Sequence, residues 1–191
     1  MHEKRIILAS SSPRRIEMMR AKGIEPGIMP ADVEELLPLV GGMNETVMFL
    51  ALKKAKAVET SIGNSEAGSI IIAADTIVYK DEPMGKPLDK EDCFRMLSAL
   101  RNSFHYVATG VAIVEAGKQK AKVFAEVTKV YFKDFSDQEL NEYLEGSEWQ
   151  DKAGGYAIQG HFGKYIEKIE GDYDNVVGYP WTRIEKELEN F

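Results

Sequence analysis

The ten residues from Asp151 to Gly160 combine charge, three glycines and one carboxamide side chain. Glycines allow a backbone to approach a ligand closely and to adopt positive φ. Lys152, ahead of the glycines, suits an anion, and Gln159, framed by small and apolar residues, suits a hydrogen-bonded heterocycle. An ordinary surface turn has a similar composition. The segment therefore indicates a ligand site only together with a second signal.

The second signal lies near the other end of the chain, where a short apolar run is followed by three serines, Pro13, Arg14 and Arg15. Ser12 before Pro13 predicts a helix N-cap with proline at the first helical position. Arginines in the first turn oppose the helix dipole, at about a few tenths of a kcal/mol each. A polyanion would reverse that cost by binding the helix N–H groups, both arginines and the hydroxyls of Ser10 and Ser12. The alternative is a solvated arginine pair on a surface helix.

Further positions could complete such a site. Asp75 lies in the middle of an apolar strand whose first part, 69–74, is predicted to be buried on both faces. A carboxylate there is costly unless it is paired, hydrogen-bonded or bound to a metal. Lys86 lies in a Gly-Lys-Pro turn, and Lys54 is one of three lysines on a predicted helix, of which one or two can face inward. Glu35 ends an acidic cluster that, with Asp75, would suit Mg²⁺ or Mn²⁺. The alternatives are a structural aspartate, a plain turn and a solvated acidic surface.

Composition sets the outer limits. The chain has 191 residues, 44% hydrophobic and 29% charged, which predicts one soluble globular domain or one domain with two lobes. A net charge of −7 argues against non-specific nucleic-acid binding but not against a nucleotide ligand. We expect no membrane segment, because no apolar run has signal-peptide character or transmembrane length. The single cysteine, Cys93, excludes an intramolecular disulfide and favours a reducing cytoplasm.

The elements that must position these residues alternate in the first half of the chain, which predicts an α/β fold with a mixed sheet. The long strands 104–115 and 119–133 are expected to form a β-hairpin. The other expected strands or extended pieces are 4–9, 26–33, 69–74 and 164–170, and the expected helices are 13–22, 45–60, 89–100, 136–145 and 181–190, with Asp89 capping the third.

Several common chemistries are excluded by spacing. The three histidines are too scattered for a zinc site, and no serine or cysteine triad is legible. The segment from Gly160 to Lys164 lacks the Walker spacing, which argues against a P-loop kinase or GTPase.

Taken in order, the motifs resemble those of the Maf proteins, the septum-formation-type nucleoside triphosphate pyrophosphatases. Each motif alone is weak, but the ordered set is specific and covers almost the whole chain. One departure is Glu34-Glu35, where many relatives have Asp-Glu; the longer glutamate favours Glu35 over Glu34 as a metal ligand. The matching segments are Leu8-Ala9-Ser10-x-Ser12-Pro13-Arg14-Arg15, Val33-Glu34-Glu35, Leu50-Ala51-x-x-Lys54-Ala55, Ala74-Asp75-Thr76-Ile77-Val78, Gly85-Lys86-Pro87, Asp151 to Gly160 and Val176-Val177-Gly178-x-Pro180.

The resemblance implies a single domain over 1–191, with a twisted mixed α/β sheet flanked by helices and two lobes around a nucleotide-binding cleft, as in Maf and ITPase-like proteins. It implies a cytoplasmic homodimer that splits a nucleoside triphosphate into the monophosphate and pyrophosphate with Mg²⁺ or Mn²⁺. Asp75 aligns with the family's proton acceptor. Arg14, Thr76 and Gln159 match the combination of the dTTP/UTP group, whereas the 7-methyl-GTP group has tryptophan in place of Arg14.

On this reading the phosphate chain is bound by four cations and two hydroxyls, of which Lys54 and Lys86 also serve catalysis. These residues are Arg14, Arg15, Lys54, Lys86, Ser10 and Ser12. Asp75 is expected either to orient and deprotonate water or to bind the metal with Glu35, and these two roles compete. Gln159 can meet both O4 and N3–H of uracil or thymine, with Thr76 as a candidate for fixing its amide orientation.

Two other interpretations stay open. A nucleotide-binding regulator of septum formation would bind without turnover, although Asp75, Lys86 and the arginine pair favour catalysis. A housecleaning enzyme for modified pyrimidine triphosphates would differ only in its physiological substrate.

Overall fold

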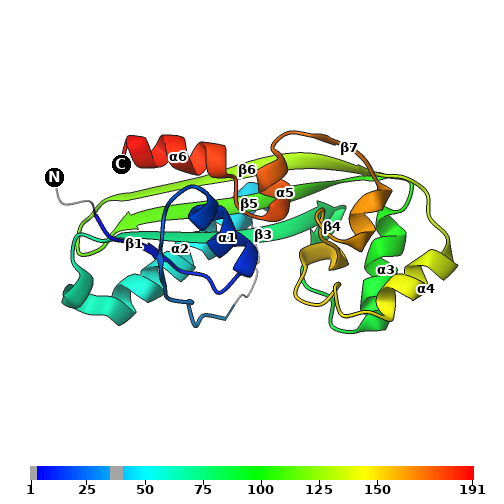
Figure 1. Cartoon of the computed structure of the whole chain (residues 1–191), viewed down its shortest axis with the longest axis horizontal. Helices are drawn as coiled ribbons and strands as arrows, with labels where there is room; N and C mark the ends of the chain where they lie inside the picture. The colour runs from blue at the N-terminus through cyan, green and yellow to red at the C-terminus, as the bar shows by residue number, and fades with distance from the viewer. Residues whose placement is uncertain (1–3, 35–40) are drawn as a thin grey trace.

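A computed structural model describes residues 4–34 and 41–191. Its centre is a seven-stranded mixed sheet of order β2-β1-β3-β5-β6-β7, with β4 also paired to β3 (Figure 1). Strand β1 is parallel to β2 and β3, and the other pairs are antiparallel. The strands are β1 Ile6–Leu8, β2 Gly27–Ile28, β3 Ile70–Lys80, β4 Glu82–Met84, β5 Phe104–Glu115, β6 Ala121–Phe132 and β7 Ile166–Glu170.

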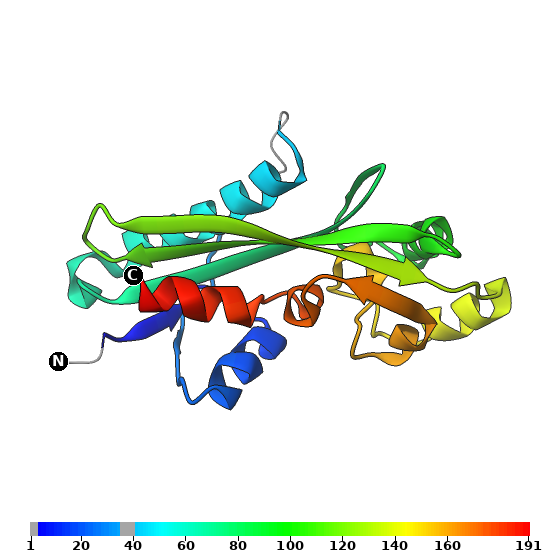
Figure 2. The ribbon, with the colours of Figure 1, turned by 90° about the horizontal axis from the view of Figure 1, so that it is seen from above.

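Helices flank this sheet. Helix α2 covers one face, and α1 and α6 lie on the other (Figure 2), whereas α3 and α4 lie at the far end of the long strands (Figure 1). The helices are α1 Pro13–Ala21, α2 Met43–Ile62, α3 Lys90–Leu100, α4 Asp137–Leu144, α5 Tyr173–Val177 and α6 Trp181–Glu189, and the 3₁₀ turns are Gly63–Glu66, Ala153–Gly155 and His161–Tyr165. None of the described helices is both long and apolar enough to cross a membrane.

Strand β3 is apolar on both faces because each face is covered. Ile71 and Ala73 pack with Ala51 and Ala55 of α2. The alternate residues, such as Ile72, pack on the opposite face against α1 and α6. The period-two geometry of a strand thus explains an uninterrupted apolar run in the sequence.

A second core forms at the α3 and α4 end. Leu97 and Leu100 of α3 pack there with Phe132 of β6 and Leu140 of α4. Because β3, β5 and β6 run through both cores, one continuous sheet carries two lobes (Figure 1).

The predicted strands and helices are present with shifted ends. Asp89 caps α3 as expected, its Oδ1 accepting the Asp92 N–H at 2.8 Å. The apolar run 69–74 forms the first part of a longer strand, since β3 runs from Ile70 to Lys80. The expectation that Asp75 lies in the middle of an apolar strand is confirmed. Strand β4 was not predicted, since it has three residues and contains Pro83, which only an edge strand tolerates.

Candidate functional site

The site lies where one edge of β3 is uncovered. Strand β5 pairs with β3 along its length, from Ile70 to Tyr79. On the other side, β1 pairs only with residues 70–72 and β4 only with residues 78–80. Residues 73–77 therefore present an open edge between two short strands. A cavity of about 840 Å³ lies against this edge, and such a change of strand connection is a typical ligand site in α/β sheets.

The predicted site residues within the described part of the chain converge on this cavity. Its lining includes Ser10, Ser12, Arg14, Arg15, Lys54, Asp75, Thr76, Lys86 and Gln159. Glu35, the other predicted metal ligand, lies outside the described residues.

Asp75 and Lys54 form the buried ion pair of the site. Asp75 is 6% exposed, and the Lys54 Nζ lies 2.5 Å from its Oδ1. Helical spacing places Lys54 on the inward side of α2, one turn from Leu50, whereas Lys53 bonds the Glu34 carbonyl and Lys56 pairs with Glu59. The prediction that only one or two of these lysines turn inward is confirmed.

Arg15 is held by protein atoms on the opposite face of β3. Its Nε donates to the Gly178 carbonyl at 2.9 Å, and its Nη1 donates to the Ala74 carbonyl at 2.8 Å. The same guanidinium donates to Ser10 Oγ and Thr76 Oγ1, each at 3.2 Å. One side chain thus links α1, the open edge of β3 and the end of α5.

The two hydroxyls beside Arg15 differ in how much hydrogen-bonding capacity they retain for a ligand. Ser10 Oγ accepts hydrogen bonds from Arg15 and from the Ser12 N–H at 3.2 Å. Because a hydroxyl has two acceptor positions and one donor, its hydrogen remains for a ligand in the cavity. Thr76 Oγ1 lies 2.9 Å from Thr109 Oγ1 and 3.5 Å from the Gly178 carbonyl oxygen. Thr76 therefore contacts the protein more fully, and within the described residues it makes no hydrogen bond to Gln159.

Three cations gather at the cavity without a carboxylate ion pair among the described residues. Burial lowers the pKa of Arg14. Burial, followed by the nearby positive charges of Arg14 and Lys86, also lowers the pKa of Lys152. Positive charges close enough to lower the pKa of Lys152 would be stabilised by an anion between them. Helix α1 adds its N-terminus there, since Ser12 starts the helix but its side chain does not cap it.

The glycines of the 151–160 segment are explained by close packing. Gly154 has a φ of +70° and donates its N–H to the Gly85 carbonyl at 2.9 Å. A Cβ there would lie 2.9 Å from Val78, and a Cβ at Gly155 would overlap Cys93 of α3. The segment is thereby fixed beside the Lys86 turn, with Gln159 exposed on the cavity wall.

The residues present fit a metal that is bound mainly by substrate. In residues 4–34 and 41–191, no three histidine, cysteine or acidic side chains lie together in a way that could hold a metal ion. Asp32 and Glu34 of the acidic cluster are exposed and do not line the cavity. Mg²⁺ is commonly held by one or two carboxylates together with substrate phosphates, and Asp75 meets that requirement.

Two parts of the site were missing from the assigned residues. The sequence marks Lys152 as suited to an anion, but only the fold brings it near Arg14 and Lys86. The short helix α5 was not predicted, although Asp172 as its N-cap and Gly178 at its C-cap are recognisable sequence signals. Gly178 matters because its carbonyl receives the Arg15 hydrogen bond.

Comparison with known proteins gives consistent results along the chain. The model of the Maf-like protein family matches residues 5–191. A protein of Alkaliphilus oremlandii named dTTP/UTP pyrophosphatase is 41% identical over 187 residues, covering 98% of this chain and 96% of its own length. Proteins of the same name from Acetivibrio thermocellus and Bdellovibrio bacteriovorus are 40% and 36% identical, covering 98% and 97% of this chain and 95% and 98% of their own.

A solved structure supports the fold alone. The Staphylococcus aureus Ham1 protein superposes with a TM-score of 0.52 over 98% of this chain and 99% of its own, at 12% identity. The expected two-lobed mixed α/β fold is confirmed by this likeness together with the sheet described above.

Proposed function

This chain belongs to the Maf family, and we propose that it is a nucleoside triphosphate pyrophosphatase that hydrolyses dTTP and UTP to the monophosphate and pyrophosphate. Full-length relatives of about 40% identity that bear this name support the activity. The observation that carries the proposal is the gathering of Arg14, Lys86 and Lys152 around a cavity that also contains Asp75.

The phosphate chain is the part of the substrate that these cations recognise. Water attack at the α-phosphorus develops negative charge on the phosphoryl oxygens and on the departing pyrophosphate, so catalysis depends on positioning and charge neutralisation. Arg14, Lys86 and Lys152 are suited to the phosphates, and the Ser10 hydroxyl can donate to a phosphoryl oxygen. Arg15 and Ser12 contribute through the α1 N-terminus, Arg15 mainly by holding its surroundings.

Asp75 is the residue best suited to the attacking water. Its carboxylate is buried at the cavity and Lys54 fixes it by a short ion pair, so it can orient the water and accept its proton. The competing role of Asp75 is to hold Mg²⁺ or Mn²⁺ together with Glu35, the latter by the family resemblance. The metal would supply charge neutralisation at the phosphate oxygens, and a metal-bound Asp75 would be the poorer base.

The base is proposed to meet Gln159. Its carboxamide can accept from N3–H and donate to O4 of uracil or thymine. The exposed position of Gln159 on the cavity wall, seven residues after Lys152, allows one segment to contact both the base and the phosphates.

We further propose that the chain acts as one domain, as a cytoplasmic homodimer, with a role in nucleotide-pool housecleaning or division arrest. Sedimentation velocity would test the dimer, since a single species at the 21.4 kDa monomer mass would contradict it.

The activity is tested by analysing products from a panel of nucleoside triphosphates with Mg²⁺ or Mn²⁺, for the wild type and Asp75→Asn. We expect UMP or dTMP with pyrophosphate from the wild type, and a loss of at least about 100-fold in the variant, as for other residues that act on the reacting group. Matching far-UV spectra would show that the variant is folded.

Two outcomes would contradict the proposal. Release of orthophosphate would move the attack to the γ-phosphorus. Tight triphosphate binding without turnover would favour the regulator of septum formation.

A further inference from the structure

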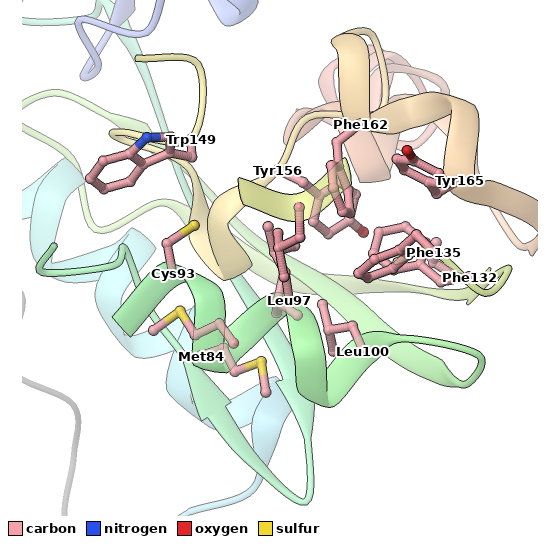
Figure 3. Close-up of a cluster of buried hydrophobic side chains, with 14 of the residues drawn as sticks. Met84, Cys93, Leu97, Leu100, Phe132, Phe135, Trp149, Tyr156, Phe162 and Tyr165 are labelled. Carbon is pink, nitrogen blue, oxygen red and sulfur yellow. The ribbon is translucent and has the colours of Figure 1, made fainter. Parts of the chain in front are cut away.

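Tyr156 belongs both to the cavity wall and to the core of the α3 and α4 lobe. It lines the cavity between Ala153 and Gln159, yet it is only 6% exposed. Its ring packs edge-on against Phe132, with centroids 4.8 Å apart. Figure 3 shows it within the same cluster as Phe162, Phe135 and Phe132. A residue of the 151–160 segment, here called the ligand-binding segment, is thus embedded in the α3 and α4 lobe.

The Tyr156 hydroxyl is bonded to a buried histidine of β5. His105 is fully buried, and its Nε2 lies 2.6 Å from the Tyr156 Oη. The His105 ring also packs edge-on against Phe132 and Tyr156. Neither residue has been given a part in the proposed hydrolysis, and the two are 51 positions apart in the chain.

This polar pair stabilises the core less than two apolar rings would. The other ring nitrogen of His105, Nδ1, is buried and has no hydrogen-bond partner among the described residues. A buried polar atom without a partner is destabilising, whereas two apolar rings of the same shape would leave none. The hydrogen bond therefore contributes orientation more than stability.

The position that Tyr156 holds is the middle of the ligand-binding segment. Ahead of it, Gly155 offers its carbonyl to the Tyr143 hydroxyl at 3.0 Å, and Gly154 bonds to the Lys86 turn. Gln159 follows three residues later on the exposed side. After Gln159, the Gly160 N–H donates to the Ala157 carbonyl at 3.1 Å, and the His161 N–H donates to Glu148 Oε2 at 3.2 Å. Gln159 thus lies between these bonds and the Tyr156 ring, which fixes the segment on its N-terminal side.

We propose that His105 is a positioning residue that sets base selectivity, by fixing through Tyr156 the place from which Gln159 reaches the base. This inference rests on the proposed function, because it assigns the base contact to Gln159. It predicts that loss of the hydrogen bond weakens discrimination between uracil and cytosine, and leaves the phosphate chemistry almost unchanged.

The test compares His105→Phe, Tyr156→Phe and the double variant, which retain the ring shapes and remove the bond. We expect the ratio of kcat/KM for UTP over CTP to fall by about tenfold, the usual worth of one such hydrogen bond. The change should lie in KM, with kcat for UTP within about twofold. The double variant should be no worse than either single one, since the pair acts as a unit.

Two further variants separate positioning from packing. His105→Gln introduces a side-chain amide that can still bond the Tyr156 hydroxyl, and should therefore retain part of the selectivity that His105→Phe loses. Tyr165→Phe removes a hydroxyl from the same core, but its ring contacts Phe135 and Phe162 instead of Tyr156, so it should behave as the wild type. The double variant leaves neither member of the pair unpaired, and thermal unfolding would show that it folds.

The same variants are titrated with UTP and CTP by calorimetry without divalent metal. An unchanged UTP-to-CTP ratio in folded Phe variants, in both kcat/KM and Kd, would overturn the inference even if the wild type releases pyrophosphate. A ratio of Kd values that shifts while the wild type has no turnover would retain the inference and contradict the proposed hydrolysis. Equal wild-type affinity for UTP and CTP would contradict the inference as well.

Discussion

Arg14 and Arg15 are neighbours in one motif, but they are used differently. Arg15 donates four hydrogen bonds to protein atoms of three separate chain segments. Arg14 makes none with the described residues, and burial lowers its pKa. A guanidinium with most of its donors occupied holds the shape of a site, and one without protein partners is suited to a ligand.

Arg15→Lys tests this difference. A lysine carries its three N–H donors on one nitrogen, which cannot reproduce the separate Nε and Nη1 atoms that bond the Gly178 and Ala74 carbonyls, so at least one of these two bonds is lost. We expect the free energy of unfolding, measured in urea, to fall by about 2 kcal/mol. Arg20→Lys is the matched control on the exposed side of the same helix, where Arg20 pairs with Glu25. Equal stability of the two variants would contradict the structural role of Arg15.

Gln159→Glu tests the base contact at the same scale. The carboxylate keeps an acceptor for N3–H but has no donor for O4, so kcat/KM for UTP should fall by at least about tenfold. Because Gln159 is exposed, the melting temperature should not change. Gln138→Glu, exposed on α4, adds the same charge far along the sheet and should leave UTP hydrolysis intact. Full activity of the first variant would refute the assignment.

Among the elements, α2 and β5 determine how closely Lys54 approaches Asp75. Gly110 of β5 pairs in register with Asp75. A Cβ at Gly110 would fall on the backbone of Val47 in α2, far inside van der Waals contact. The helix can therefore approach the sheet closely only over a glycine, and this approach lets Lys54 reach Asp75.

Gly110→Ala should therefore lift α2 from the sheet. We expect a loss of about 2–4 kcal/mol in the free energy of unfolding, because the clash is with backbone atoms that cannot rotate away. Gly146→Ala serves as the control, since its Cβ would meet only the Tyr143 carbonyl at an ordinary 3.5 Å. A Gly110→Ala protein as stable as the control would show that the close approach of α2 to the sheet does not depend on Gly110.

For the whole molecule, the buried His105 predicts how stability depends on pH. Burial, with a smaller contribution from Lys80, lowers the pKa of His105 to about 3 in the folded protein. The unfolded chain has an ordinary histidine pKa of about 6.5. Between these values the unfolded state binds the extra proton, so stability is complete above pH 6.5 and falls as the pH drops toward 3.

The measurement is urea unfolding at pH 7 and pH 4.5 for the wild type and the His105→Phe/Tyr156→Phe double variant. From the two pKa values, the wild type should lose about 2–3 kcal/mol more than the variant between these pH values. Carboxylates that titrate in the same range are common to both proteins and cancel in the comparison. Equal losses would show that His105 is not buried in its neutral form.

The sequence by itself determined the α/β class, the hairpin, most helices and most of the charged residues that line the cavity. These follow from local signals, such as the serine and proline before Arg14 and the period-two apolar runs. Strand β4 and helix α5 are not predicted by the sequence, because they are only three and five residues long and too short to show a periodic pattern.

Only the tertiary structure decided how the site residues are used. Asp75 and Thr76 are adjacent in sequence but face opposite sides of β3, toward Lys54 and Arg15. The open edge between β1 and β4 exists because two strands far apart in the chain stop short of each other. The Gly178 and Ala74 partners of Arg15, the cations near Lys152 and the Tyr156 partner of His105 are likewise distant in sequence. No local pattern specifies contacts that depend on how whole elements pack.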